Sequence, residues 1–331
     1  MQDFIATVTA AIGGAGSRLW PLYLPGMIIL AWVVWQRKGE GGSFVGWLFP
    51  RRIYLHASHL VDIQLFVVGR ILALLGAFQL AAVGTAMAAL TISLLGGQIT
   101  EVDRVPGWAI GLLLLVASDF AVYWVHRVHH ENPALWPFHA VHHSAEVMTP
   151  VTVYRKHPFY DLLSSALKGV LIGVTQGVLL SFFVSHISVP LLLGVNVFYL
   201  AFNAVTANLR HTHVWLSFGR VLEHVFISPA QHQVHHSSAL KHYNKNYGEV
   251  LALWDWMFGT LYICEREEAL TFGVGDAEGN RIEQPHPTLS AALCLPLKEA
   301  AAALRRKPRD ATPAEAPKPT PQLTPDITPA E

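Results

Sequence analysis

The sequence predicts an all-α integral membrane protein, in which two transmembrane helical hairpins and an N-terminal span support a cytoplasmic helical cap carrying histidine boxes. Three observations predict this fold class. The 331 residues are 52% hydrophobic and only 14% charged, with a mean hydropathy of +0.36, whereas a soluble domain carries about 25% charged residues. Long apolar runs recur along the chain. Nine of the 18 histidines fall in three five-residue boxes.

Five apolar segments approach the length of about 20 residues that a helix needs to cross a bilayer. The first is short and is interrupted by Pro21 and Pro25. The second is long enough for one tilted helix or for a helix with a break. The expected spans are Trp20–Trp35, Leu65–Leu95, Val105–Val125, Leu162–Val184 and Val189–Asn208.

Basic residues between the first two spans set the expected orientation. Arg37, Lys38, Arg51 and Arg52 predict a cytoplasmic loop, because loops on that side are enriched in Lys and Arg. Each later hairpin then leaves the cytoplasm and returns to it just before a histidine-rich segment. Loop charge and hydropathy therefore predict that the boxes and the C-terminal tail are cytoplasmic.

Composition divides the chain into four expected regions. Residues 1–104 form an N-terminal transmembrane region, 105–265 hold the boxes, 266–304 form a C-terminal cytoplasmic helical segment, and 305–331 form a disordered tail rich in Pro and Ala. The formal net charge of zero argues against a nucleic-acid partner. The only two cysteines, Cys264 and Cys294, make neither a metal pattern nor a disulfide framework.

The histidine boxes have a spacing suited to metal binding. Residues at i, i+3 and i+4 share one face of a helix, so each box can direct its imidazoles to a single point. Imidazole suits iron, zinc and copper, and eight or more imidazoles exceed the limit of about six ligands for one ion. Two metals are the simpler inference. The candidate ligands are His126 and His130, with His129 at the edge of their face, then His139, His142 and His143, and finally His232, His235 and His236.

Polar residues near the boxes have two possible roles. Asp119 lies two helical turns before His126 and could orient a ligand through its second ring nitrogen, or it could line a water pocket; Asn203 faces the same expected cavity. Asn246 and Asp255 follow the third box. They could hydrogen-bond ligating imidazoles, or this segment could be a turn followed by an interfacial aromatic belt at Trp254 and Trp256.

Four segments resemble the fatty acid hydroxylase / sterol desaturase superfamily, in particular its bacterial sterol desaturase branch. They are "DFAVYWVHRVHH", "LWPFHAVHHSAE", "NLRHTHVWLSFG" and "ISPAQHQVHHSSALKHYNKNYGEVLALWDWMFGTLY", and the resemblance covers Ser118 to Tyr262. It implies ligand roles for the eight box histidines other than His129, which lies outside the family pattern. It also implies a role for His211 and leaves His157 and His213 as possible ligands.

The resemblance further implies a non-haem di-iron centre in an integral membrane enzyme of the bacterial inner membrane. Such a centre uses O2 and two electrons to hydroxylate or desaturate a fatty acyl, sterol or related lipid. The electrons must come from a separate ferredoxin or reductase, because "GVGDAEG" is a poor dinucleotide motif. A membrane zinc hydrolase, disfavoured because no HExxH occurs, and a metal transporter, which needs ligands at mid-membrane, remain the alternatives.

Overall fold

The computed structural model describes residues 20–21, 23–39, 41–75, 81–95, 106–183 and 197–305. In these ranges the secondary structure is helical, apart from isolated β-bridges, which confirms the all-α prediction. The longer helices are α2 (Tyr23–Lys38), α5 (Ala57–Leu74), α6 (Ala81–Leu94), α7 (Gly107–Glu131), α9 (Pro158–Phe183), α11 (Val197–Thr206) and α15 (Leu289–Arg305). The shorter ones are α3 (Phe44–Leu48), α4 (Arg51–Tyr54), α8 (Trp136–His143), η1 (Thr152–Tyr154), η2 (Ala207–Leu209), α12 (Gly219–Leu222), α13 (Pro229–His235), η3 (Leu240–His242) and α14 (Leu253–Met257).

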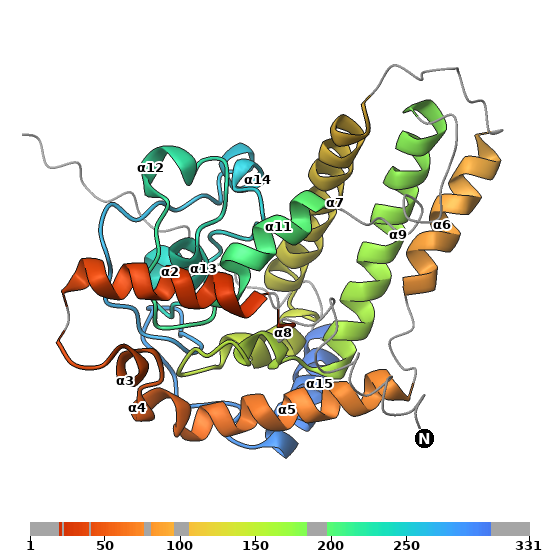
Figure 1. The fold of residues 1–331 in the computed structure, drawn as a ribbon. Helices are drawn as coiled ribbons and strands as arrows, with labels where there is room; N and C mark the ends of the chain where they lie inside the picture. Colours follow the sequence, from red (N-terminus) through yellow and green to blue (C-terminus); the bar gives the residue numbers. More distant parts are fainter. Residues whose placement is uncertain are drawn as a thin grey trace, which may run out of the picture.

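Three helices are long and apolar enough to cross a membrane: Ala57–Leu74 in α5, Trp108–Glu131 in α7 and Pro158–Phe182 in α9. The helices α7 and α9 run side by side at a steep angle, with the shorter α6 packed along α9 (Figure 1). Exposed Leu, Val, Phe and Trp side chains cover much of α7 and α9. A helix with such a surface is stable where lipid surrounds it. We call α6, α7 and α9, which pack together, the membrane bundle.

Glycines allow α6 and α9 to pack closely. A Cβ atom on Gly173 of α9 would lie 2.3 Å from the backbone oxygen of Gly84 in α6. One helical turn further on, a Cβ atom on Gly177 would lie 2.6 Å from the Cβ atom of Thr91. Small residues serve this purpose in membrane helices, where close backbone approach replaces the hydrophobic effect as the source of association.

The predicted spans differ from the observed helices in two places, and a third span is described only in part. The segment Leu65–Leu95 contains two helices, α5 and α6, so its break is real, and α5 lies across the bundle rather than along it (Figure 1). The helix α2, which occupies most of Trp20–Trp35, also lies crosswise. In Val189–Asn208 only the later part is seen, as α11, because residues 189–196 lie outside the described ones.

The cap is built around two short helices, α8 and α13, which contain the second and third boxes. Val141 on α8 packs in one apolar cluster with Val61 and Leu65 of α5 and with Ala292 of α15. The helix α8 is therefore enclosed by α5 and α15 on its apolar side. The helix α15 falls in the segment expected to be helical, whereas residues 306–331 lie outside the described ones.

Candidate metal centre

Nine histidines form two adjacent groups in which the potential ligand atoms all lie within 4.8 Å of one another. The rings of His143 in one group and His236 in the other are stacked, with centroids 4.4 Å apart, so the two groups share a boundary. The five-histidine group contains His126, His130, His139, His143 and His235, and the four-histidine group contains His142, His211, His232 and His236.

The second and third boxes each contribute to both groups. We expected each box to converge on one point, but α8 supplies His139 and His143 to the five-histidine group and His142 to the other. The reason is helical geometry: residues four apart are nearly aligned, whereas adjacent residues diverge by about 100° around the axis. In the third box, His232 and His236 are four residues apart and join the four-histidine group. His235 lies on another side of the helix and joins the five-histidine group.

Within each group, imidazole nitrogens approach to the spacing of ligands around one ion. The Nε2 atom of His139 lies 3.1 Å from that of His126 and 3.3 Å from that of His143. The Nε2 atom of His211 lies 3.2 Å from that of His142 and 3.1 Å from that of His232. For a metal–nitrogen bond of about 2.1 Å, neighbouring ligands are about 3.0 Å apart in an octahedron and about 3.4 Å apart in a tetrahedron. The nitrogens present therefore fit a metal ion in each group.

Backbone carbonyls determine which ring nitrogen faces the centre. His126 donates its Nδ1–H to the carbonyl of Tyr247 at 2.8 Å, and His235 donates its Nδ1–H to the carbonyl of Lys245 at 2.8 Å. In a neutral imidazole this leaves a lone pair on Nε2. The Nε2 atoms of His130, His235 and His236 are buried without a hydrogen-bond partner among the described residues. Buried nitrogens of this kind need a partner, and a metal ion supplies one.

The loop that presents these carbonyls is shaped by Asn246 and Asp255. Asn246, with a positive φ of 57°, donates its side-chain amide to the carbonyls of Gln231 and Tyr262. Asp255 accepts from the backbone N–H groups of Tyr247 and Gly248 at 2.8 Å each. Both side chains therefore hold the ligand-orienting loop, and their described bonds go to this loop and its surroundings rather than to an imidazole.

Burial keeps the second and third boxes in the form that binds metal. It lowers the pKa of His235 from 6.5 to about 4, and it lowers the pKa of the other five box imidazoles of α8 and the third box well below 6.5. A neutral imidazole has the lone pair that a metal needs, and an imidazolium does not. The rings are therefore competent ligands at neutral pH.

A buried ion pair holds α8 from the side opposite the ligands. The guanidinium of Arg155 and the carboxylate of Asp62, both fully buried, are 3.0 Å apart. Arg155 also donates to the carbonyl of Val141 at 2.8 Å and to the hydroxyl of Ser144 at 3.0 Å, at the C-terminal end of α8. It further donates to the carbonyl of His286 at 3.2 Å. One side chain thus connects α5, α8 and the segment before α15.

Asp119 connects the membrane bundle to the cap. Its carboxylate accepts from the backbone N–H groups of Val250 and Leu251 at 2.9 and 3.0 Å and from the indole of Trp254 at 3.1 Å. Its described partners are thus in the 250–254 segment, not among the histidines. The other polar candidate, Asn203, donates to the carbonyl of Tyr199 within α11.

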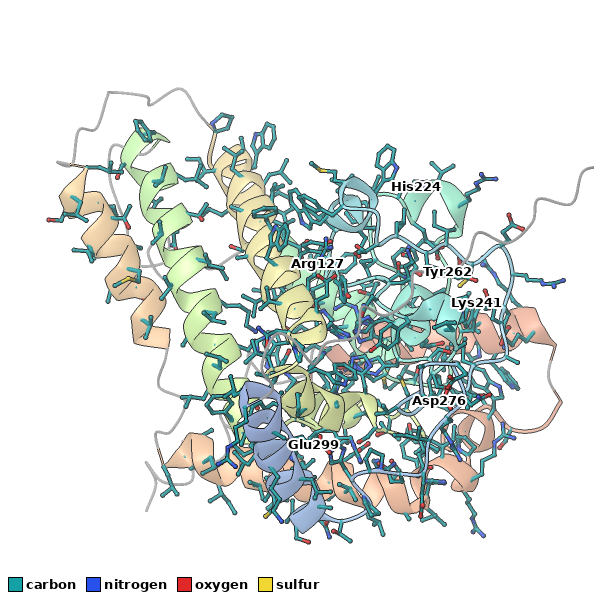
Figure 2. The ribbon with its side chains drawn as sticks, turned by 180° about the vertical axis from the view of Figure 1, so that it is seen from behind. Arg127, His224, Lys241, Tyr262, Asp276 and Glu299 are labelled. Atoms are coloured by element: carbon teal, nitrogen blue, oxygen red, sulfur yellow. The ribbon has the colours of Figure 1, made fainter. Side chains whose placement is uncertain are left out.

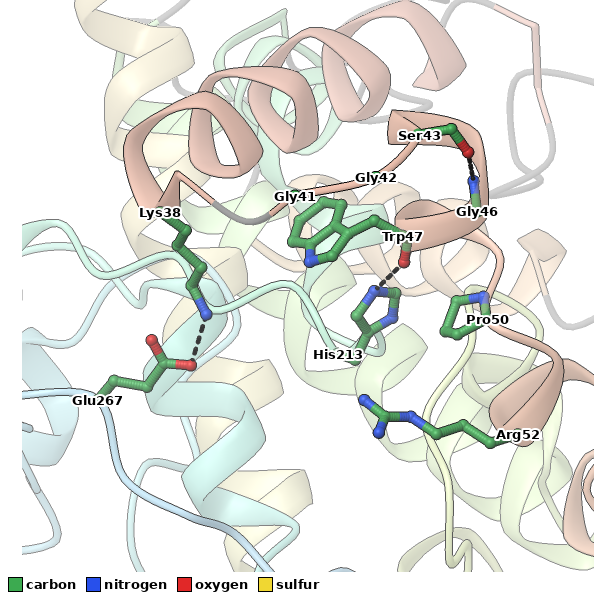
Figure 3. A pocket seen from close by; sticks show the side chains of 10 residues that line it. All are labelled: Lys38, Gly41, Gly42, Ser43, Gly46, Trp47, Pro50, Arg52, His213 and Glu267. Atoms are coloured by element: carbon green, nitrogen blue, oxygen red, sulfur yellow. Dashed lines mark hydrogen bonds and ion pairs between the residues drawn. The ribbon is translucent and has the colours of Figure 1, made fainter.

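The three histidines that we considered possible ligands lie outside both groups. His129 donates to the carbonyl of Val125 at 2.7 Å, and its ring contacts Tyr160. His157 donates to the carbonyl of Leu293 at 3.1 Å. His213 faces away from the centre and lines a separate pocket of about 550 Å³ (Figure 3), where its Nε2 donates to the carbonyl of Trp47 at 2.9 Å.

A small cavity of about 20 Å³ adjoins the five-histidine group. His130, His143 and His235 line one part of it, and Tyr243 and Asn244 line another. A space of this size holds about one water molecule. There is therefore room for one small molecule, such as a water, beside the five-histidine group.

Sequence reasoning missed the carbonyls of Lys245 and Tyr247 and the ion pair of Arg155 with Asp62. The only available signal for the loop was the "NKN" sequence at 244–246, since asparagine favours turns and tolerates a positive φ. For the ion pair the signal was an aspartate inside an apolar segment, Asp62, which requires a partner when buried.

One family model and several known proteins match part of this chain. The family model for fatty acid hydroxylases matches residues 111–260. The chain is 32% identical over 163 residues to an ornithine lipid hydroxylase of Rhizobium tropici, covering 49% of this chain and 45% of that protein. It is 30% identical over 171 residues to human alkylglycerol monooxygenase, covering 51% and 34% of the two proteins.

A plant relative is also similar. The chain is 31% identical over 178 residues to a Delta(7)-sterol-C5(6)-desaturase of Nicotiana tabacum, covering 52% of this chain and 56% of that protein. The chain thus spans about half or less of the length of these relatives. No solved structure matches the chain significantly. Residues 111–260, which hold all nine grouped histidines, are thus similar to the fatty acid hydroxylase / sterol desaturase superfamily.

Proposed function

We propose that the protein is a membrane-bound non-haem di-iron oxygenase that uses O2 and two electrons to hydroxylate or desaturate a lipid C–H bond. The observation that carries this proposal is the pair of adjacent all-imidazole groups at the end of a helix that can cross a membrane. The proposed iron ligands are the nine histidines of these groups.

The composition of the two histidine groups favours a di-iron oxygenase over a zinc hydrolase and over a metal transporter. A catalytic zinc site keeps three protein ligands and an open position, whereas these groups offer five and four imidazoles. Neither group includes a carboxylate among the described residues, whereas a glutamate is one of the three zinc ligands in several zinc hydrolases. A transporter needs ligands along a path through the membrane, but the imidazoles of α7 lie in its last two turns.

The residues of the chain would hold, orient and shield the metal ions. Bound iron would supply the oxidising power that cleaves an unactivated C–H bond, which no side chain can provide. The carbonyls of Lys245 and Tyr247 fix two imidazoles in the ligating tautomer. Five of the remaining seven rings are buried, which limits the water around the centre and so protects reactive species from side reactions.

The proposed substrate is a lipid. The named relatives act on an ornithine lipid, an alkylglycerol and a sterol, which share long apolar regions. The exposed apolar surface of α7 and α9 gives a bilayer-dissolved molecule direct contact with the protein. Hydroxylation and desaturation both begin with removal of one hydrogen, so the same centre can serve either reaction.

Electrons must reach the centre from another protein. The chain has two cysteines, of which Cys264 is buried and Cys294 is exposed, and an iron–sulfur cluster is commonly held by four. We infer a ferredoxin or reductase as donor. The basic segment around Arg51 and Arg52 belongs on the cytoplasmic side of a membrane. We therefore propose that the cap faces the cytoplasm, where the donor would meet it, and that the membrane is a bacterial inner membrane.

The test combines metal analysis with lipid mass spectrometry. Purified protein should contain two iron ions per chain, and cells that produce it should show one lipid class with a gain of one oxygen or a loss of two hydrogens. A variant with both His143→Ala and His236→Ala, which removes one ligand from each group, is the matched control and should show neither. Stoichiometric zinc in place of iron, or lipids identical in wild-type and variant cells, would contradict the proposal.

A further inference from the structure

The short helices α12 and α14 form an apolar face on the surface of the cap. Its side chains are exposed to an extent unusual for large apolar residues, with Val221 at 80%, Met257 at 67% and Trp256 at 60%. Leu222 and Phe258 complete it at 53% and 37%. A cluster of exposed apolar residues marks a place of contact with something other than water. We call these five residues the α12–α14 face.

This face continues the apolar surface of α7. The ring of Phe258 lies 5.1 Å from that of Trp124 and 6.4 Å from that of Phe120, which is itself 39% exposed on α7. Trp254, next to the face, packs on Phe120 at 4.9 Å. The apolar surface of a helix that crosses the membrane thus extends without interruption onto the cap.

The bond between Trp254 and Asp119 shows how far along α7 this face lies. Trp254 donates its indole N–H to Asp119, which is twelve residues from the first residue of α7 at Gly107. Twelve residues of helix span about 18 Å, and the hydrocarbon core of a bilayer is about 30 Å thick. If α7 crosses the membrane, the segment beside Asp119 lies at a depth where lipid surrounds it.

The polar groups of this region are arranged as such a position requires. Asp255 and Glu223 have no exposed surface and Asp119 has 2%, so the carboxylates are turned inward. Glu223 accepts hydrogen bonds from the hydroxyls of Ser217 and Ser228 at 2.7 Å each. A carboxylate enclosed by the protein does not have to meet lipid, where an exposed charge is costly.

Basic and aromatic groups surround the face. The exposed Arg220 is adjacent to Val221, and the ring of His224 lies 5.4 Å from that of Trp256. Figure 2 shows His224 at the top of the cap, whereas Asp276 lies toward its lower edge. Arg220 and His224 thus border the face without being part of it.

We propose that the α12–α14 face is inserted into the membrane beside α7, so that the cap is partly immersed rather than held above the bilayer. The occupant is lipid, because the face is continuous with the surface of a membrane helix. This proposal goes beyond the oxygenase function and does not depend on it, since it concerns where the cap sits and not what the metal centre does.

Spin-label accessibility in vesicles tests the proposal. In a Cys294→Ser background of the full chain, a nitroxide on Met257→Cys is compared with two controls after reconstitution into phosphatidylcholine–phosphatidylglycerol vesicles. Leu112→Cys, on the exposed surface of α7, is the lipid control, and Ala277→Cys, in an exposed loop, is the water control. We expect the label at 257 to match Leu112→Cys, with a several-fold higher ratio of collisions with O2 to collisions with a water-soluble nickel chelate than at 277.

A second position guards against a local effect of the label. Val221→Cys, on the other helix of the face, should give the same lipid-like ratio. Labels at 257 and 221 that collide with the nickel chelate as often as the label at 277 would overturn the proposal and leave the face as a surface for a soluble protein. Neither result depends on turnover, so the outcome is separate from that of the proposed activity.

Discussion

The Nδ1–H groups of His126 and His235 each donate to a backbone carbonyl, and this bond selects the nitrogen that faces the centre. A carbonyl is present whatever side chain its residue carries. A search for side chains near the boxes could therefore find the ligands but not the groups that orient them. Conversely, Asn246 and Asp255 were found as candidates near the ligands, and they act through the loop that carries those carbonyls.

The division of the histidines predicts how single variants lose metal. His130→Ala should lower iron in the five-histidine group, and His232→Ala should lower iron in the four-histidine group, so each variant should retain about half of the metal. Activity should fall by at least about 100-fold in both, because loss of a residue that only orients a ligand already costs 10- to 100-fold.

Iron per chain, measured by plasma mass spectrometry, checks this prediction. His224→Ala is the control, since His224 lies outside both groups and bonds to the carbonyl of Arg220. If His130→Ala removed all iron and His232→Ala removed none, the two groups would not be separate sites.

The buried pair of Arg155 with Asp62 predicts a large loss of stability when one partner is removed. Arg155→Met leaves Asp62 buried without its counter-ion, which should lower the free energy of unfolding by about 3–5 kcal/mol. The matched control is Arg281→Met, because Arg281 pairs with Glu146 at 3.2 Å but is 44% exposed. An exposed pair contributes at most about 1 kcal/mol. Thermal unfolding in detergent, followed by tryptophan fluorescence, distinguishes the two, and equal shifts would show that the buried pair is not special.

At the level of the element, the close packing of α6 on α9 depends on the absence of side chains at two glycines. Gly173→Val would place its Cβ atom within 2.3 Å of the Gly84 backbone oxygen, so the helices must separate. Such overpacking typically costs about 1–3 kcal/mol. The same change at Gly69, where nothing lies within 4 Å of the added Cβ atom, should leave the melting temperature unchanged or slightly raised.

The long apolar helices were easier to predict than the direction in which each one runs. Hydropathy correctly indicated α7 and α9, because lipid requires long uninterrupted apolar segments. It could not show that α5 lies across the bundle, since the same apolar composition suits a helix that packs on the cap. Long-range contacts fix the position of α5, among them the bonds of Asp62 to Arg155 and to the hydroxyl of Thr152 at 2.6 Å. Long-range partners of this kind are not encoded in local periodicity.

At the level of the whole molecule, metal should stabilise the fold, because its proposed ligands come from distant parts of the chain. His126, His139, His211 and His232 lie on or beside α7, α8, η2 and α13. A ligand present at 100 times its dissociation constant adds about 2.7 kcal/mol to stability. Treatment with a chelator should therefore lower the melting temperature, and anaerobic addition of Fe(II) should restore it. A melting temperature that is unaffected by chelation and by iron would count against a metal centre.

Acid should destabilise the molecule, and His286 should contribute to this. Burial, with a smaller effect of the Arg155 charge, lowers the pKa of His286 from 6.5 to about 4. Between these values the unfolded chain binds a proton that the folded protein does not, so stability falls as the pH decreases from 6.5 to 4. The slope is at most about 1.4 kcal/mol per pH unit for one proton.

The comparison of wild type with His286→Gln isolates this contribution, because the other buried histidines titrate in both proteins. The melting temperature of wild type should fall more steeply than that of the variant as the pH decreases from 6.5 to 4, and the difference should be constant above pH 6.5. Parallel curves over the whole range would show that His286 is not the group responsible.

The position of the centre in the molecule could be predicted from sequence, whereas its internal arrangement could not. Loop charge and hydropathy placed the three boxes and His211 together, and the structure brings them together. The division into five and four ligands depends on how α8 and α13 are rotated about their axes. The rotation of α8 is set by its packing on α5 and α15, which no spacing within a box encodes.

The helix α8 gives ligands to both groups from a single turn, with His139 and His143 on one side and His142 on the other. The distance between the two sites is therefore set by the geometry of one helix, and not by a hinge between domains. Inserting one residue after Val141 would rotate the following imidazoles by about 100° and would remove ligands from both sites together. The two sites therefore constrain the length of this segment.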